Sequence, residues 1–97
     1  MAMRIISRKR LQQFSALHSD AETSLEHWYQ TAKHGNFGSF AELRATFPSA
    51  DKVDGLTVFN IGGNKYRLIA AMHYNTKRIY IQSVLTHDEY LKGKWKE

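Results

Sequence analysis

The stretch "LTVFNIGGNKYRLIAAMHYNTKRIYIQSVLT", residues 56–86, decides the fold of this chain. Its apolar residues recur at nearly every second position, which is the period of β-strands. Two clusters of turn-forming residues, "GGN" and "NTK", divide the stretch into three runs. The stretch therefore predicts three antiparallel strands that follow one another as a meander.

The middle strand of this meander has two unlike faces. At period two, the first face is apolar and carries Tyr66, Leu68, Ala70, Met72 and Tyr74. The second face mixes cations with small and apolar residues: Lys65, Arg67, Ile69, Ala71 and His73. The first face is predicted to pack on the core. The second is either the surface of an ordinary half-exposed strand or a surface that binds an anion.

Helical patterns fill the chain before the meander, after a short predicted strand at residues 3–6. Three serines in suitable positions to cap helices are Ser7, Ser19 and Ser39. The second and third are followed three residues later by glutamate, which is the capping-box pattern. Gly35 and Pro48 are predicted to stop the second and third helices. The tail after residue 86 is predicted to be a final helical turn or a flexible end.

Helices that precede strands are typical of an α+β fold. We expect one domain over residues 1–97, with a small twisted antiparallel sheet of about four strands and the N-terminal helices packed on one face. The other face of the sheet is then left free for a ligand. A chain of 97 residues with 42% hydrophobic residues can bury one modest core.

Composition excludes several classes of protein. With no cysteine, the chain has neither disulfides nor thiolate chemistry. No apolar run approaches the roughly 20 residues that span a bilayer, and the basic start "MAMRIISRKR" is unlike a signal peptide. We therefore expect a cytoplasmic protein that does not act on membranes.

The positive charge is concentrated at the two ends of the chain. The net charge is +5, to which residues 1–18 contribute +4, residues 19–56 contribute −3 and residues 57–97 contribute +4. If the two ends meet in the fold, they form one basic surface suited to a polyanion. The alternative is a solvated basic surface that only keeps the protein soluble.

Metal and phosphate-loop chemistry have little support. The five histidines are scattered, with no H-x-x-x-H pair, so we expect no metal site and no cofactor. The cluster "IGGNK" lies between two strands and opens no helix, which favours a hairpin turn over a phosphate loop.

The remaining candidates suit the cleavage of RNA. Arg67, with Lys65, could bind a phosphate, and His87 could take and give a proton. Tyr90 lies three residues further on, so a helical turn would place it beside His87. In this reaction the 2′-OH attacks the adjacent phosphate, so no metal is required. Further candidates for binding RNA are Asn60, Lys92 and Lys94.

Each of these residues also has an ordinary structural interpretation. An arginine on a strand can pair with a neighbouring acid, and a histidine after a strand can cap a helix or stay exposed. Tyr90 can pack against the sheet, and Asn60 can organise the turn that follows it. Taken one at a time, the residues do not separate the two interpretations.

Three segments in this order, "TFPSADKVDG", "VFNIGGNKYRLIAAMHY" and "IYIQSVLTHDEY", resemble the HigB toxins of bacterial toxin–antitoxin pairs, in the RelE/ParE superfamily. The resemblance covers about residues 4–90. It implies a RelE-like fold and an endoribonuclease that cleaves translated mRNA on the ribosome. The implied partners are mRNA, the ribosome and a HigA-like helix-turn-helix antitoxin.

The resemblance also assigns roles to residues. Arg67 in "YRLIAA" matches the arginine that binds the scissile phosphate in RelE-like toxins, and "THDEY" offers His87 and Tyr90 for the rest of the catalytic set. Lys52 and Lys65 match the general basic character of that site. Two alternatives remain: a non-catalytic gyrase inhibitor like the ParE branch, and a basic module that binds RNA or the ribosome without cleaving.

Overall fold

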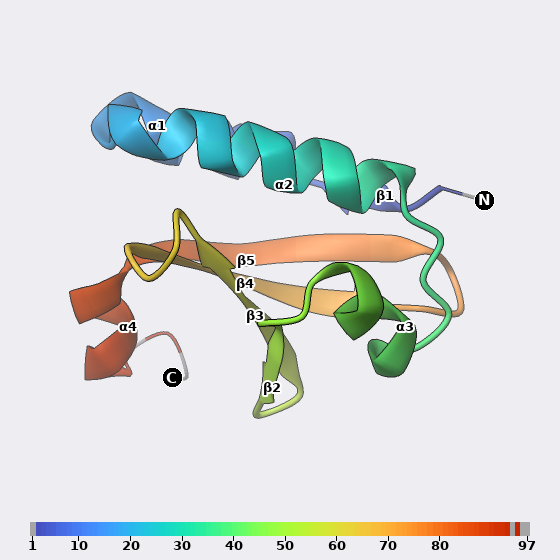
Figure 1. Ribbon diagram of the computed structural model, residues 1–97. Helices are drawn as coiled ribbons and strands as arrows, with labels where there is room; N and C mark the ends of the chain where they lie inside the picture. The colour runs from blue at the N-terminus through green and yellow to red at the C-terminus, as the bar shows by residue number, and fades with distance from the viewer. Residues whose placement is uncertain (1, 94, 96–97) are drawn as a thin grey trace.

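The structure of the protein, a computed structural model, describes residues 2–93 and residue 95 (Figure 1). Its elements are, in chain order, β1 (Arg4–Ile6), α1 (Arg8–Leu17), the 3-10 turn η1 (Ser19–Ala21), α2 (Glu22–His34), α3 (Phe40–Thr46), β2 (Asp51–Val53), β3 (Leu56–Ile61), β4 (Tyr66–His73), β5 (Arg78–Thr86) and α4 (His87–Lys92). The α+β class and the three-strand meander β3–β4–β5 are confirmed.

The sheet has five strands in the order β1-β5-β4-β3-β2. The predicted number was about four, because β2 has only three residues and is too short to show an alternating pattern. The sheet is also mixed rather than purely antiparallel, since β1 pairs in parallel with β5. The period of a sequence predicts a strand but not the direction of its partner, so this pairing was not predicted.

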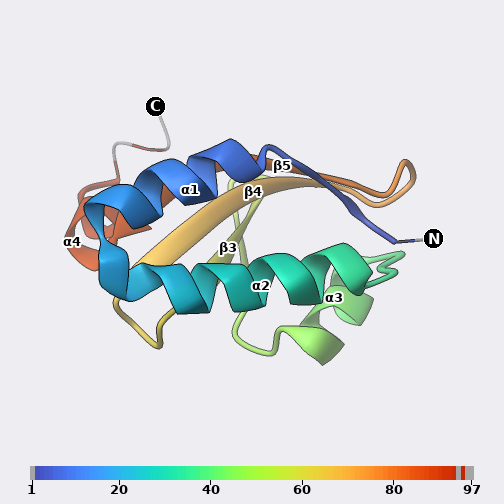
Figure 2. The same cartoon turned by 90° about the horizontal axis from the view of Figure 1, so that it is seen from above.

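Helices α1 and α2 lie side by side across one face of the sheet (Figures 1 and 2). The core fills the space between the two layers, with Leu25 and Trp28 from α2 against Phe59, Leu68 and Ile79 from the sheet. The apolar face predicted for β4 is therefore the face that α1 and α2 cover. The opposite face of the sheet, which we call the open face, carries Arg67.

Local signals explain most helix boundaries. The side chain of Ser7 accepts a hydrogen bond from Lys9 N, and that of Ser39 accepts one from Glu42 N, as predicted. The capping box predicted at Ser39 is only half formed, because Oε1 of Glu42 accepts from Gly38 N rather than from Ser39 N. The capping box predicted at Ser19 is wrong: residues 19–21 form η1, and α2 begins at Glu22 without a side-chain cap. The chain reverses between α1 and α2 within a few residues, and a 3-10 turn makes this reversal.

Gly35 ends α2 for a different reason from the one predicted. Its φ of −75° is not left-handed, so the backbone does not require glycine. A methyl group at this position would lie 2.2 Å from Cζ of Phe37. Gly35 is therefore needed because the Phe37 ring occupies the space of a side chain.

The basic N-terminal and C-terminal segments meet at one place in the fold, where β1 is the neighbour of β5. Arg4 lies directly opposite Arg78 in this pairing. Within the described residues, none of the helices has the length and apolar character needed to cross a membrane.

Candidate active site on the open face of the sheet

Arg67 is the central residue of the candidate site. It lies on β4, pairs with Asn60 of β3 and Leu85 of β5, and is only 8% exposed. Its Nη1 donates to the carbonyl oxygen of Tyr66 at 3.1 Å. No carboxylate pairs with it among the described residues. Because buried charges are normally paired, this guanidinium is suited to bind an anion from outside the protein.

Tyr90 covers the guanidinium of Arg67. The Cζ atom of Arg67 lies 5.5 Å from the centre of the Tyr90 ring, within the range of a cation–π contact. Tyr90 also stacks on Trp95, with ring centres 5.3 Å apart and planes 12° from parallel. Trp95 Nε1 also donates to the carbonyl oxygen of Tyr90 at 3.1 Å. The contacts hold Tyr90 in place next to Arg67.

Helix α4 brings Tyr90 to this position, and a capping box fixes its start. Glu89 N donates to Oγ1 of Thr86 at 3.2 Å, and Thr86 N donates to Oε1 of Glu89 at 2.9 Å. His87 N donates to the carbonyl oxygen of Lys65 at 3.0 Å, which ties the helix start to the turn before β4. The pattern "THDE" is the sequence signal for this cap, and it predicts a helix rather than a flexible end.

A pocket of about 370 Å³ lies between β5 and α4. Its lining residues are Ser83, Leu85, Glu89, Lys92 and Trp95. Leu85, which lines the pocket, is the direct cross-strand neighbour of Arg67. Sequence reasoning missed Ser83 and Glu89, because the pocket exists only once α4 folds back under the sheet (Figure 1).

The structure brings several of the predicted residues together. Asn60 is exposed and lies directly across from Arg67, so both side chains are on the open face. Lys92 lines the pocket beside α4. His87 is exposed at the first position of α4, three residues before Tyr90. Lys94, also predicted to bind RNA, lies outside the described residues.

The other two predicted lysines point elsewhere. Lys65 was predicted to share a face with Arg67, but its Nζ lies 3.7 Å from Oδ2 of Asp20 on η1. It precedes β4, so strand alternation does not govern its direction. The Nζ of Lys52 lies 5.6 Å from the centre of the Phe40 ring, on α3. Neither contact directs the lysine toward Arg67.

Asp20 anchors the start of β4 from the helix layer. The hydroxyl of Tyr66 donates to Oδ1 of Asp20 at 2.6 Å. This hydrogen bond lowers the pKa of Asp20, and the nearby Lys65 ammonium adds to that effect. The same hydrogen bond, with burial and the charge of Asp20, raises the pKa of Tyr66. Since the carbonyl of Tyr66 accepts from Arg67, the anchor also steadies the residue that holds the guanidinium.

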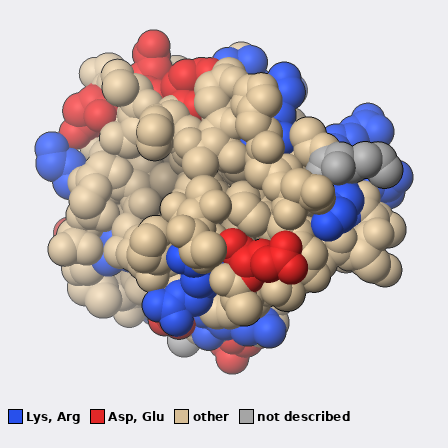
Figure 3. Space-filling model, turned by 45° about the vertical axis from the view of Figure 1, so that its right-hand side comes forward, with Lys and Arg blue, Asp and Glu red and all other residues tan. Residues whose placement is uncertain are grey.

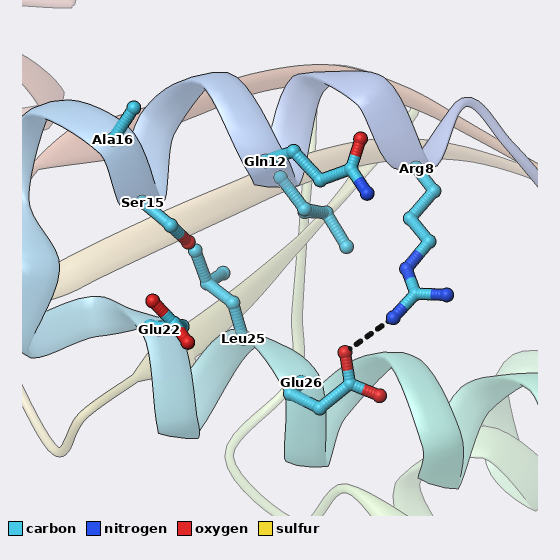
Figure 4. A pocket seen from close by; sticks show the side chains of 8 residues that line it. Arg8, Gln12, Ser15, Ala16, Glu22, Leu25 and Glu26 are labelled. Carbon is cyan, nitrogen blue, oxygen red and sulfur yellow. Dashed lines mark hydrogen bonds and ion pairs between the residues drawn. The ribbon is translucent and has the colours of Figure 1, made fainter.

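A separate hollow of about 400 Å³ lies between α1 and α2 (Figure 4). The guanidinium of Arg8 pairs there with Glu26 at 2.7 Å, so its charge is already satisfied. Arg67 has no such partner, which distinguishes the two places. In the described part of the chain, no group of three or more His, Asp or Glu residues is arranged to hold a metal ion.

Comparison with known proteins identifies the family. The model of the HigB toxin family, described as the RelE-like toxic component of a toxin–antitoxin system, matches residues 21–93. The chain belongs to this family. The matched segment runs from the start of α2 to the end of α4 and contains Arg67, His87 and Tyr90.

Relatives of this HigB-family chain include the mRNA interferase toxin HigB of Escherichia coli K12, which is 34% identical over 91 residues, covering 91% of this chain and 88% of the relative. The mRNA interferase HigB of Shigella flexneri has the same identity and coverage. That of Escherichia coli O6:H1 is 28% identical over 93 residues, covering 93% of this chain and 90% of the relative.

Proposed function

We propose that this HigB-family toxin is an mRNA interferase, an endoribonuclease that cleaves mRNA during its translation on the ribosome. Two of the relatives are named mRNA interferases. The observation that supports it most strongly is Arg67, a nearly buried guanidinium without a carboxylate partner among the described residues. The toxin would act in the cytoplasm and be neutralised by a HigA-like helix-turn-helix antitoxin.

The proposed reaction needs no metal ion, because the nucleophile belongs to the substrate. The 2′-oxygen attacks the adjacent phosphorus, the bond from phosphorus to the 5′-oxygen breaks, and a 2′,3′-cyclic phosphate and a 5′-OH result. The site must remove the 2′ proton, stabilise the dianionic phosphorane and protonate the leaving oxygen. The reaction is balanced in protons, because one proton leaves the 2′-OH and one is added to the leaving 5′-oxygen.

Arg67 is the proposed stabiliser of the phosphorane. One Nη1 hydrogen is used by the Tyr66 carbonyl, which leaves other guanidinium hydrogens for phosphate oxygens. The low exposure of Arg67 strengthens such hydrogen bonds, because little water competes for them. Tyr90, which covers the guanidinium, is proposed to orient the 2′-OH.

His87 is proposed as the general acid or base, since it is exposed on the same helix as Tyr90 and can carry a proton near neutral pH. Asn60 and Lys92 are proposed to position the RNA on either side of Arg67. Asn60 borders it on β3, and Lys92 lines the pocket between β5 and α4. Lys52 and Lys65 are left out of this proposal because their contacts are directed elsewhere.

The test is growth arrest on induced expression, combined with primer extension on a translated message. Wild type should arrest growth and leave new 5′ ends within coding sequence, whereas Arg67→Ala and His87→Gln should do neither. The matched control is Lys9→Ala, which removes an exposed cation from α1 and should behave like wild type.

If the Arg67 and His87 variants arrest growth as strongly as wild type and no cleavage appears, the nuclease proposal is wrong. Inhibition of gyrase or binding without cleavage would then explain the toxicity better. Circular dichroism of each purified variant establishes that a loss of activity is not a loss of fold.

A further inference from the structure

The open face carries a second group of cationic and aromatic residues, at the end of the sheet where β4 leads into β5. Its members are Arg4, His73, Arg78 and Tyr80, which we call the distal cluster. Arg78 lies directly opposite Arg4 on one side and His73 on the other. Tyr80 lies two residues from Arg78 on β5. Because residues paired across strands share a face, and residues at every second position do too, the four side chains are on one face.

This face is the one that carries Arg67. On β4, His73 lies six residues after Arg67, and an even spacing keeps both side chains on the same side of the strand. The residues between them in the other phase, Leu68, Ala70 and Met72, pack on the core under the helices. At about 3.3 Å per residue, the distal cluster is roughly 20 Å from Arg67. It cannot contact the same phosphate.

The members of the distal cluster contact one another. The rings of His73 and Tyr80 meet edge to face, with centres 4.9 Å apart. Nη1 of Arg78 lies 3.5 Å from the hydroxyl of Tyr80. Arg4, His73 and Arg78 are exposed. The neighbouring Lys77 is used differently, because its Nζ donates to the carbonyl oxygen of Phe37 at 2.9 Å.

The charges of the cluster are not balanced within the described part of the chain. Arg4 and Arg78 face each other across the β1–β5 pairing, and neither forms an ion pair with a described carboxylate. Like charges directly opposite each other destabilise a sheet. In Figure 3, Lys and Arg side chains lie in groups at the right and along the bottom of the view, whereas the largest groups of Asp and Glu lie at the upper left and near the centre.

We propose that the distal cluster is a second RNA-binding site, which holds a phosphate between Arg4 and Arg78 and stacks an unpaired base on Tyr80 or His73. Two guanidiniums beside aromatic rings, here the exposed His73 and the half-buried Tyr80, are a combination with which proteins bind single-stranded RNA. The choice of RNA as ligand rests on the proposed function. The RNA is either the message that reaches Arg67 or another strand, and both present the same chemistry.

The experiment measures binding of fluorescein-labelled 2′-O-methyl RNA by anisotropy over a range of salt concentrations, using the full chain. Methylation removes the 2′-OH, so the probe stays intact whether or not the protein cleaves RNA. The double variant Arg4→Gln/Arg78→Gln is compared with Lys9→Gln/Arg10→Gln, which removes the same charge from α1 in the helix layer.

The distal double variant should bind about tenfold more weakly than wild type, and its salt dependence should be shallower by about 0.7 in slope, the value for one phosphate contact on a single strand. The α1 double variant should stay within about twofold of wild type. Tyr80→Leu should weaken binding about fivefold through lost stacking, and Tyr80→Phe should restore it.

Two probe lengths distinguish the sources of RNA. If the distal double variant binds only the long probe more weakly, a probe that spans the roughly 20 Å to Arg67, the cluster binds the same message as Arg67. If it binds a short probe more weakly to the same extent, the cluster binds RNA on its own. Either result supports the proposal. Equal binding by the two double variants with both probes would overturn it.

This outcome is separate from the test of cleavage. If the wild type does not cleave RNA but its RNA binding depends on Arg4 and Arg78, the proposed function is wrong and the distal site is supported. A wild type that cleaves, with no effect of the distal variants on RNA binding, would show the reverse. Thermal unfolding of each variant checks that the fold is kept.

Discussion

At the scale of single residues, Arg67 is expected to lower the stability of the fold, because its charge is nearly buried, and to bind the phosphate of the RNA. Replacing it by methionine keeps a long side chain under Tyr90 but removes the nearly buried charge. We expect the free energy of unfolding to stay equal or to rise by about 1 kcal/mol, because an apolar group avoids the desolvation of the guanidinium. Growth arrest should be lost. Thermal unfolding and the growth assay measure the two effects.

The control is the next residue on the strand. Leu68 is fully buried on the helix side, and Leu68→Ala should cost about 2 to 5 kcal/mol of stability. If Arg67→Met destabilises the protein as much as Leu68→Ala does, Arg67 supports the fold rather than an anion site.

The hydrogen bond between Tyr66 and Asp20 predicts how stability changes with pH. The lowered pKa of Asp20 adds stability above its ordinary value of 3.8, and this is lost as the pH falls through the native pKa. The raised pKa of Tyr66 adds stability below its ordinary value of 10.0, and this is lost as the pH rises through the native pKa. Tyr66→Phe should therefore lower the unfolding midpoint at pH 7, with the difference shrinking in both acid and alkali.

Unfolding midpoints of wild type and Tyr66→Phe across this pH range check the prediction. Tyr29→Phe is a suitable control, because its hydroxyl makes no hydrogen bond in the described structure, and its midpoint should track wild type. A constant gap between Tyr66→Phe and wild type at every pH would show that the loss is one of packing.

At the scale of elements, the short helix α4 depends on its cap. Thr86→Val removes the hydroxyl that accepts from Glu89 N, which should cost the helix about 1 kcal/mol. Because α4 carries His87 and Tyr90, we expect cleavage activity to be strongly reduced although the free energy of unfolding of the whole protein changes little. Hydrogen exchange of the α4 amides and primer extension measure the two effects, and Thr86→Ser should behave like wild type. Unchanged cleavage despite faster exchange would place α4 outside the site.

The elements also show which features the sequence could predict. Long alternating runs and the turn clusters "GGN" and "NTK" predicted β3, β4 and β5, and Ser7 and Ser39 predicted two helix starts. The parallel pairing of β1 with β5 depends on a tertiary contact, which no local sequence pattern encodes. The pairing of Arg67 with Asn60 follows from the turn between their strands. The pocket between β5 and α4 could not be predicted from the sequence, because it forms only where α4 packs on β5.

At the scale of the whole molecule, Gly35 links the helix layer, the edge strand and the core. Its carbonyl accepts from Met3 N at 3.2 Å, just before β1. The ring of Phe37, which is 4% exposed, packs against Gly35 and contacts Phe47 at 6.1 Å between ring centres. Phe47 in turn contacts Phe59 of β3 at 5.1 Å. A substitution at Gly35 should therefore disturb side-chain packing across the core.

Gly35→Ala should lower the free energy of unfolding by about 1 to 3 kcal/mol, because its methyl group displaces the Phe37 ring. The backbone contributes nothing to this loss, since φ is −75°. In the matched control Gly38→Ala, the nearest atom is Oε2 of Glu42 at 3.1 Å, the end of a flexible side chain that can move. Chemical denaturation measures both variants. Adding Phe37→Leu to Gly35→Ala should recover part of the loss if the ring is the cause, whereas equal stability of the two alanine variants would contradict it.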